Sequence, residues 1–212
     1  PAFQVSAQNK NLQFEHLQTA DGLSQSNVTC ILQDSRGFMW FGTRDGLNKY
    51  DGYNFTIYRN DQKNKNSISN NYITDITESK NGDLWIATRG GGLNRFDRQL
   101  AKFISYKHDQ KNNKSISDDF LTAVTEVGNG DLWIGTESAG VNLFNNKSGT
   151  FYQYKFNPAE PKSLSNDIIN CIYEYKEKNL WVGTKQCGFN LYVAKSKTLH
   201  RFHNNYRSDN GR

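Results

Sequence analysis

The sequence predicts an all-β protein assembled from four copies of one four-stranded antiparallel unit. Three observations lead to this fold class. Four tryptophans lie 45, 48 and 48 residues apart, at Trp40, Trp85, Trp133 and Trp181. Each has the same kind of neighbours, and the second copy reads Asp83-Leu84-Trp85-Ile86-Ala87-Thr88. No segment carries a helical hydrophobic period of useful length.

The second unit shows the predicted elements in chain order. A β-branched run predicts its first strand, and Asn81-Gly82 then gives a strong hairpin signal, because the favoured turn needs positive φ. Two further turns, the first of them glycine-rich, separate the remaining strands. The predicted strands span 73–78, 84–88, 93–96 and 103–106. A polar connector then leads to the next unit.

A sheet of this kind has two apolar faces and cannot bury both alone. Stacking like sheets radially around an axis solves the problem, and the result is a β-propeller of four blades. The tryptophan of each second strand is then a structural residue between adjacent blades. A sugar-stacking role would instead require exposed indole rings.

Small residues recur at two further positions of the unit. Two residues after each tryptophan stand Gly42, Ala87, Gly135 and Gly183, which predicts close approach of a neighbouring backbone. The turn after the second strand ends in glycine in every unit, and we expect positive φ there. These glycines are Gly46, Gly92, Gly140 and Gly188.

The strand count exceeds that of a closed four-bladed ring. Residues 12–17 read as a lone outer strand, which makes seventeen strands where such a ring needs sixteen. We therefore expect an incomplete part of a longer propeller, although four blades could close if that strand were disordered. Residues 1–11 are predicted to be a disordered or mature N-terminal segment and 12–212 a propeller fragment, with blades at about 23–59, 67–107, 115–156 and 163–203.

Composition excludes several functional classes. The net charge of +5 is spread over polar connectors without a dense basic stripe, which argues against nucleic-acid binding. Three cysteines without a C-x-x-C spacing predict neither a disulfide scaffold nor a zinc site, and we expect no cofactor. An acid recurs seven residues before three of the tryptophans, at Glu78, Glu126 and Glu174. We interpret these acids as structural hydrogen-bond partners rather than as a catalytic pair.

The turn after each second strand supplies the candidate ligand-binding residues. Propeller rims gather one loop from each blade around the axis, and the Ser-Ile-Ser connectors should share this rim. Arginine there would suit a carboxylate or sulfate on an acidic sugar. The alternative is that these are ordinary solvated loop charges. The candidates are Arg44, Asp45, Arg89, Glu137 and Lys185.

The run from Ile73 to Asp97, together with Asp21-Gly22-Leu23-Ser24, closely resembles the two-component regulator propeller repeat. The resemblance covers roughly Phe14 to Phe202 and recurs four times. It implies a seven-bladed propeller in the periplasmic sensor region of a hybrid two-component system, with a membrane span, a histidine kinase and a response regulator elsewhere in the protein. Many such sensors respond to polysaccharide fragments.

The functional prediction is a non-catalytic, periplasmic ligand sensor that belongs to an inner-membrane protein with histidine kinase activity. Its expected partners are an oligosaccharide, the remaining blades, the downstream kinase and, through open blade edges, a second copy. Two alternatives are a glycan lyase or hydrolase built on a propeller and a protein-interaction scaffold.

Overall fold

The computed structural model describes residues 14–202, and almost all of their regular structure is β-strand. Two short 3₁₀ turns, η1 (Thr19–Asp21) and η2 (Lys176–Lys178), are the exceptions within this range. The strands form four antiparallel sheets, each in simple chain order. The first sheet holds β1 (Val28–Gln33), β2 (Met39–Thr43), β3 (Gly46–Tyr50) and β4 (Phe55–Tyr58). The second holds β5 (Ile73–Glu78), β6 (Leu84–Thr88), β7 (Gly92–Asp97) and β8 (Lys102–Tyr106). The third holds β9 (Leu121–Glu126), β10 (Leu132–Thr136), β11 (Val141–Asn145) and β12 (Thr150–Tyr154). The fourth holds β13 (Ile169–Tyr175), β14 (Asn179–Thr184), β15 (Phe189–Val193) and β16 (Thr198–Phe202).

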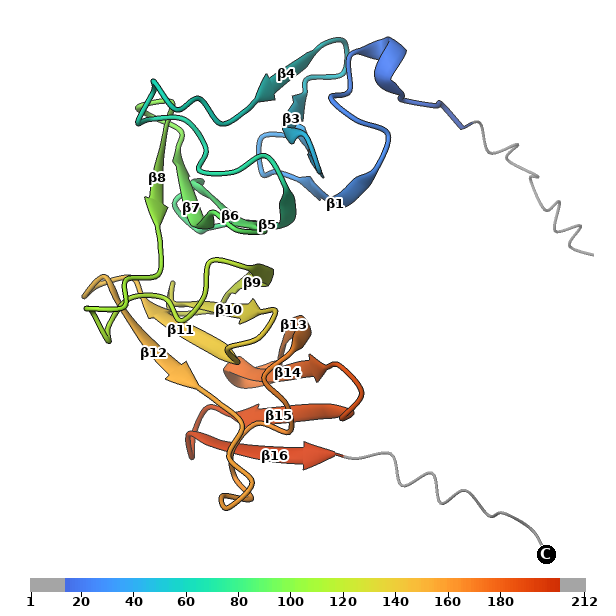
Figure 1. Ribbon diagram of the computed structural model, residues 1–212. Coiled ribbons are helices and arrows are strands. Elements are labelled where there is room, and N and C mark those ends of the chain that lie inside the picture. The colour runs from blue at the N-terminus through green and yellow to red at the C-terminus, as the bar shows by residue number, and fades with distance from the viewer. Residues whose placement is uncertain (1–13, 203–212) are drawn as a thin grey trace, which may run out of the picture.

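The four sheets follow one another along an open arc (Figure 1). Their first strands, β1, β5, β9 and β13, contact one another in sequence and form the inner side of the arc. The first and fourth sheets lie at opposite ends of the arc, so the described residues do not form a closed four-bladed ring (Figure 1). The all-β propeller architecture predicted from the repeats is confirmed.

The turn glycines behave as the sequence predicts. Gly46, Gly92, Gly140 and Gly188 have φ of +122°, +72°, +77° and +73°, the region that side chains other than glycine rarely adopt. At Gly140 a Cβ would also run into the carbonyl oxygen of Tyr154. Glycine is therefore required there by both the backbone angle and the space.

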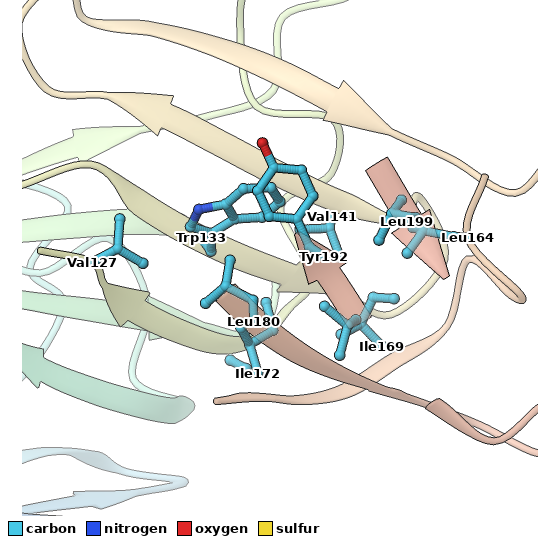
Figure 2. Packing of buried hydrophobic residues seen from close by; sticks show 11 residues of the cluster. Val127, Trp133, Val141, Leu164, Ile169, Ile172, Leu180, Tyr192 and Leu199 are labelled. Atoms are coloured by element: carbon cyan, nitrogen blue, oxygen red, sulfur yellow. The ribbon is translucent and has the colours of Figure 1, made fainter. Parts of the chain in front are cut away.

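Three of the four tryptophans lie between neighbouring sheets. Trp40, Trp85 and Trp133 are 1%, 1% and 3% exposed. Each indole contacts an aromatic ring of the next sheet, at centroid distances of 5.9 Å to Phe96, 5.5 Å to Phe144 and 4.5 Å to Tyr192, respectively. Figure 2 shows the last of these pairs above the aliphatic residues of the fourth sheet. Such burial makes each tryptophan a main contributor to the cohesion between sheets.

Trp181 departs from the prediction. Its side chain is only partly buried, and its aromatic contacts, to Phe189 and Phe202, are within its own sheet. The physical reason is that the indole faces away from the third sheet, and no described sheet lies beyond the fourth. The inter-blade role predicted for Trp181 is therefore not observed within residues 14–202.

The small residues after the tryptophans make room for a side chain, not for a backbone as the sequence suggested. A Cβ on Gly42 would lie 2.8 Å from Ile73 Cγ2, and a Cβ on Gly135 would lie 2.7 Å from Ile169 Cγ2. Each isoleucine begins the inner strand of the next sheet. Close packing between consecutive sheets thus depends on the absence of a Cβ methyl group from the glycine that follows the tryptophan.

The lone strand predicted at 12–17 is not observed in its described part, since residues 14–17 belong to no strand. All four described sheets already have a fourth strand, so none of them offers an outer position to this segment. Residues 12 and 13, like the predicted N-terminal segment 1–11 and residues 203–212, lie outside the described range. The blade limits and the seven-bladed ring stay predictions. In the described range no helix has the length and apolarity to cross a bilayer.

Candidate functional site

The rim is the end of the arc where the turns after the second strands meet the connectors between sheets. In the first three sheets, backbone hydrogen bonds join the turn to the connector that leads into the following sheet. The amides of Gly46, Gly92 and Gly140 donate to the carbonyls of Asn71, Asp119 and Asp167 at 2.8, 3.0 and 2.9 Å. The turns and connectors therefore form one continuous surface, as expected from the repeat.

A buried polar module fixes this surface, and sequence reasoning missed it. Asn94 Oδ1 accepts from the Ser69 amide at 3.0 Å, and Asn94 Nδ2 donates to Ser69 Oγ at 2.8 Å. The same reciprocal pair joins Asn48 to Ser24, Asn142 to Ser117 and Asn190 to Ser165. All four asparagines are 0% exposed. An asparagine eight or nine residues after each tryptophan is the signal that could have revealed the module.

Three of the five predicted site residues come together around Tyr72, which directly precedes β5. The guanidinium carbons of Arg44 and Arg89 lie 5.3 and 5.5 Å from the centre of the Tyr72 ring. Arg89 also pairs with Glu137, Nε to Oε1 at 2.5 Å and Nη2 to Oε2 at 3.2 Å. The hydrogen bond and charge of Glu137 raise the pKa of the Arg89 guanidinium.

The other two predicted residues do not join this cluster. Asp45 pairs with Arg59, whose Nη2 lies 2.8 Å from Asp45 Oδ2. Lys185 is exposed, and its amide donates a backbone hydrogen bond to the Ile168 carbonyl. The fourth turn thus lies on the same rim without a side-chain link to the first three.

Aromatic residues complete the rim, and the sequence analysis did not select them. Tyr72 and Phe120 each stand directly before an inner strand, and their carbonyls accept from the amides of Arg89 and Glu137, each at 2.9 Å. Phe120 is 48% exposed and lies beside Gly90. Charged and aromatic side chains therefore alternate along the rim, a combination that can hold a ring by its face and an anionic group by its charge.

The recurring glutamates have the structural role that the sequence suggested. Each accepts a hydrogen bond from the first turn of the preceding sheet: Glu78 from the Ser35 amide at 2.7 Å, Glu126 from Lys80 at 3.2 Å and Glu174 from Gly128 at 3.2 Å. Burial raises the pKa of Glu126, and the Lys80 amide opposes this effect. Among residues 14–202 no cluster of histidine, cysteine or acidic side chains has a metal-binding arrangement.

Comparisons with known proteins agree with the repeat analysis. The family model "Two component regulator propeller" matches residues 22–45, 67–90 and 163–186. A curated relative, histidine kinase P4 of Formosa agariphila, is 53% identical over 68 residues, which are 32% of this chain and 5% of that protein.

Solved structures extend the likeness to the whole arc. The extracellular domain assigned to a hybrid two-component system of B. thetaiotaomicron has a TM-score of 0.79 at 26% identity, over 89% of this chain and 26% of that one. Virginiamycin B lyase of Staphylococcus aureus has a TM-score of 0.63 at 16% identity, over 86% of this chain and 57% of that one, and shares the fold alone. This chain thus spans about a quarter of that extracellular domain and a small part of histidine kinase P4.

Proposed function

We propose that this chain, whose repeats are those of the two-component regulator propeller family, is an extracytoplasmic, non-catalytic segment that senses a ligand for a two-component signalling protein. Its shape and sequence are similar to the extracellular domain of a hybrid two-component system over 89% of its length, which supports the sensor role and the location outside the cytoplasm. The observation that carries the binding part of the proposal is the cluster of Arg44 and Arg89 around Tyr72 on the rim.

The proposed ligand is an oligosaccharide fragment with an acidic group. Tyr72 and Phe120 offer aromatic surface for the apolar face of a sugar ring, and an arginine beside them suits a carboxylate or a sulfate. Because Glu137 already engages Arg89, Arg44 is the guanidinium on this cluster that a ligand anion would bind. The ion pair in turn holds Arg89 in position beside the ring.

Signalling would follow from preferential binding to one conformation of the whole protein. A ligand shifts a conformational equilibrium only by the difference between its affinities for the two states. We propose a periplasmic setting within an inner-membrane protein, where this shift would bias a histidine kinase on the other side of the membrane. The repeat family and the similarity to histidine kinase P4 support this arrangement.

The two other functions expected from the sequence have less support. A lyase or hydrolase needs an acid and a base beside the substrate, whereas the recurring glutamates of the described chain are hydrogen-bonded to turns at the end opposite the rim. The likeness to virginiamycin B lyase is one of fold alone. No feature of the described surface favours a protein partner over a sugar.

The test is calorimetry of the intact extracellular region against matched acidic and neutral oligosaccharides. We expect Arg44→Gln to weaken binding of the acidic ligand by about tenfold, because a charge-assisted hydrogen bond is lost. Arg36→Gln is the control, since Arg36 is an exposed arginine in the turn between β1 and β2, away from the rim. Equal affinity for acidic and neutral ligands in both variants would refute the proposed role of the rim.

A further inference from the structure

A cavity lies at the end of the arc opposite the rim, between the third and fourth sheets. Its volume is about 470 Å³, within the range of small-molecule sites. The third sheet contributes Trp133, Tyr152 and Tyr154, and the fourth contributes Tyr192. Lys178 and Lys197, from the two turns of the fourth sheet at this end, complete the lining.

The matching space between the first and second sheets is much smaller, and charged side chains occupy part of it. There the volume is about 190 Å³, and Arg98 reaches into it to pair with Asp34 at 2.9 Å and with Glu78 at 3.2 Å. Arg98 stands thirteen residues after Trp85, and the residue at that position in the fourth sheet is Ala194. The partner of Arg98 changes as well, from Asp34 to Val127 at the equivalent position.

A further substitution on the third sheet widens the cavity. Opposite the tryptophan on the third strand, the first two sheets carry the long cations Lys49 and Arg95. The third sheet carries Leu143 there. Three positions that hold charged side chains at the first interface, Asp34, Arg98 and Lys49, thus hold the shorter apolar Val127, Ala194 and Leu143 around the cavity between the third and fourth sheets.

These substitutions also free a hydrogen-bond donor. In the first sheet the indole N–H of Trp40 donates to Asp34 Oδ2 at 2.7 Å. Val127 replaces that acceptor in the third sheet, and within the described residues the N–H of Trp133 makes no hydrogen bond. Figure 2 shows this nitrogen on the side of the ring that faces Val127. The hydroxyl of Tyr192 points away from Leu180 and Ile172 in the same view (Figure 2).

The charge of the lining favours an anion. Lys178 and Lys197 provide two positive charges and Asp131 one negative charge. The Asp131 carboxylate is already occupied, because Oδ2 accepts from Asn129 at 2.7 Å and Oδ1 accepts from the Asn146 amide at 3.2 Å. No salt bridge from Lys178 or Lys197 is present among the described residues.

We propose that this cavity is a second ligand site, distinct from the rim, for a small organic anion with a single ring. The ring would lie against Tyr152 and Tyr154 and accept a hydrogen bond from the Trp133 indole. Its carboxylate or sulfate would lie near Lys178 and Lys197. A uronic acid and an aromatic carboxylate share this chemistry, and the experiment distinguishes the two sources.

The test follows the indole N–H resonance of Trp133 by NMR while the purified protein is titrated with glucuronate, 4-hydroxybenzoate and, as an uncharged ring, glucose. We expect the resonance to shift with at least one anion and not with glucose. A shift with glucuronate alone assigns the site to acidic sugars, and a shift with 4-hydroxybenzoate alone assigns it to aromatic acids. No shift with any anion up to about 10 mM, a concentration far above a typical site affinity, would overturn the proposal.

Three variants separate this site from the rim. The double variant Val127→Asp, Ala194→Arg copies the Asp34–Arg98 pair into the cavity, and we expect it to abolish the shift. Lys178→Gln should weaken anion binding by about tenfold, as expected for one lost charge-assisted contact. Arg44→Gln on the rim should leave it unchanged. An unaltered affinity in the filled double variant, once its melting temperature shows that it is folded, would also refute the proposal.

Discussion

Replacing Gly135 with alanine tests how consecutive sheets pack. A Cβ at this position would lie 2.7 Å from Ile169 Cγ2, 2.9 Å from Thr122 Oγ1 and 3.0 Å from Ile169 Cβ, and the first two distances are shorter than real Cβ contacts. Overpacking of this kind costs about 1–3 kcal/mol. Alanine also reduces the conformational entropy of the unfolded chain, which stabilises the folded state by about 0.4–1 kcal/mol. We therefore expect Gly135→Ala to lower the free energy of unfolding by about 1–2 kcal/mol.

The chain itself contains the compensating change. In the second sheet the same position holds Ala87, and Leu121 begins the inner strand of the next sheet in the same buried cluster. Leucine has no Cγ2, because it branches one carbon further from the backbone. Glycine is thus paired with isoleucine at the first and last interfaces. Alanine is paired with leucine at the interface between the second and third sheets. The variant Ile169→Leu should therefore relieve much of the strain that Gly135→Ala introduces.

A double-mutant cycle measures this relief. Urea unfolding of the parent, both single variants and the double variant gives the four free energies, provided that the slopes with urea agree. We expect a favourable coupling of about 1 kcal/mol, since the two residues are in contact. At the first interface Ile73→Leu should relieve less of the strain of Gly42→Ala, because a Cβ on Gly42 would also meet Cys30 Sγ of the same sheet. A Gly135→Ala cost that is equal in the isoleucine and leucine backgrounds, within about 0.5 kcal/mol, would refute the argument.

Three further outcomes follow from buried groups. Cys171 should react with iodoacetamide at pH 8 while Cys30 does not. Cys171 is exposed, whereas burial and the charge of Asp75 raise the pKa of Cys30 to about 12. Equal labelling of the two cysteines in peptide mass spectra would contradict this. Burial also raises the pKa of Asp75 above its ordinary 3.8. The folded state then binds this proton more tightly than the unfolded state, so the contribution of Asp75 to stability decreases as pH rises from 3.8 through the raised value. Urea midpoints should show a smaller decrease across this range in Asp75→Asn, and identical pH profiles would count against the assignment. Asn94→Ala should lower the free energy of unfolding by about 2–3 kcal/mol, because it removes a fully buried side chain and leaves the half-buried Ser69 amide without its acceptor, whereas the exposed Asn113→Ala should change it by less than about 0.5 kcal/mol. Urea unfolding compares the two, and similar effects would contradict the role of the polar module.

The repeat made most of the fold predictable. Strand positions follow from features inside one unit, such as β-branched runs and Asn81-Gly82, and the strands predicted at 73–78 and 84–88 have the same limits in the structure. The burial of Trp181 could not be judged in this way. An indole is buried by the next sheet, so its environment depends on residues about 48 positions away and not on its own neighbours.

The rim was predictable as a place but not as a set of contacts. The repeat indicates which turns share one end, and on that end the structure brings Arg44, Arg89 and Glu137 near one another. Whether Glu137 pairs with Arg89 depends on side-chain reach between adjacent sheets, and no sequence spacing gives that. Tyr72 was missed because it lies just outside the strand pattern, although an aromatic residue before an inner strand recurs at Phe120.

The two candidate sites indicate where function enters a repeat protein. Positions that are the same in every unit, such as Asn94 and its counterparts, are fully buried and maintain the scaffold. Positions that differ between units decide what each interface can hold. Asp34 and Arg98 close the first interface with a buried ion pair, and their joint replacement by Val127 and Ala194 opens the third. Losing only one member of a buried pair would leave an uncompensated charge, so the two changes must occur together to give a stable open cavity. An interface opened in this way can bind a ligand without disturbing the strands that form it, and a ligand in contact with both sheets would stabilise one arrangement of the two.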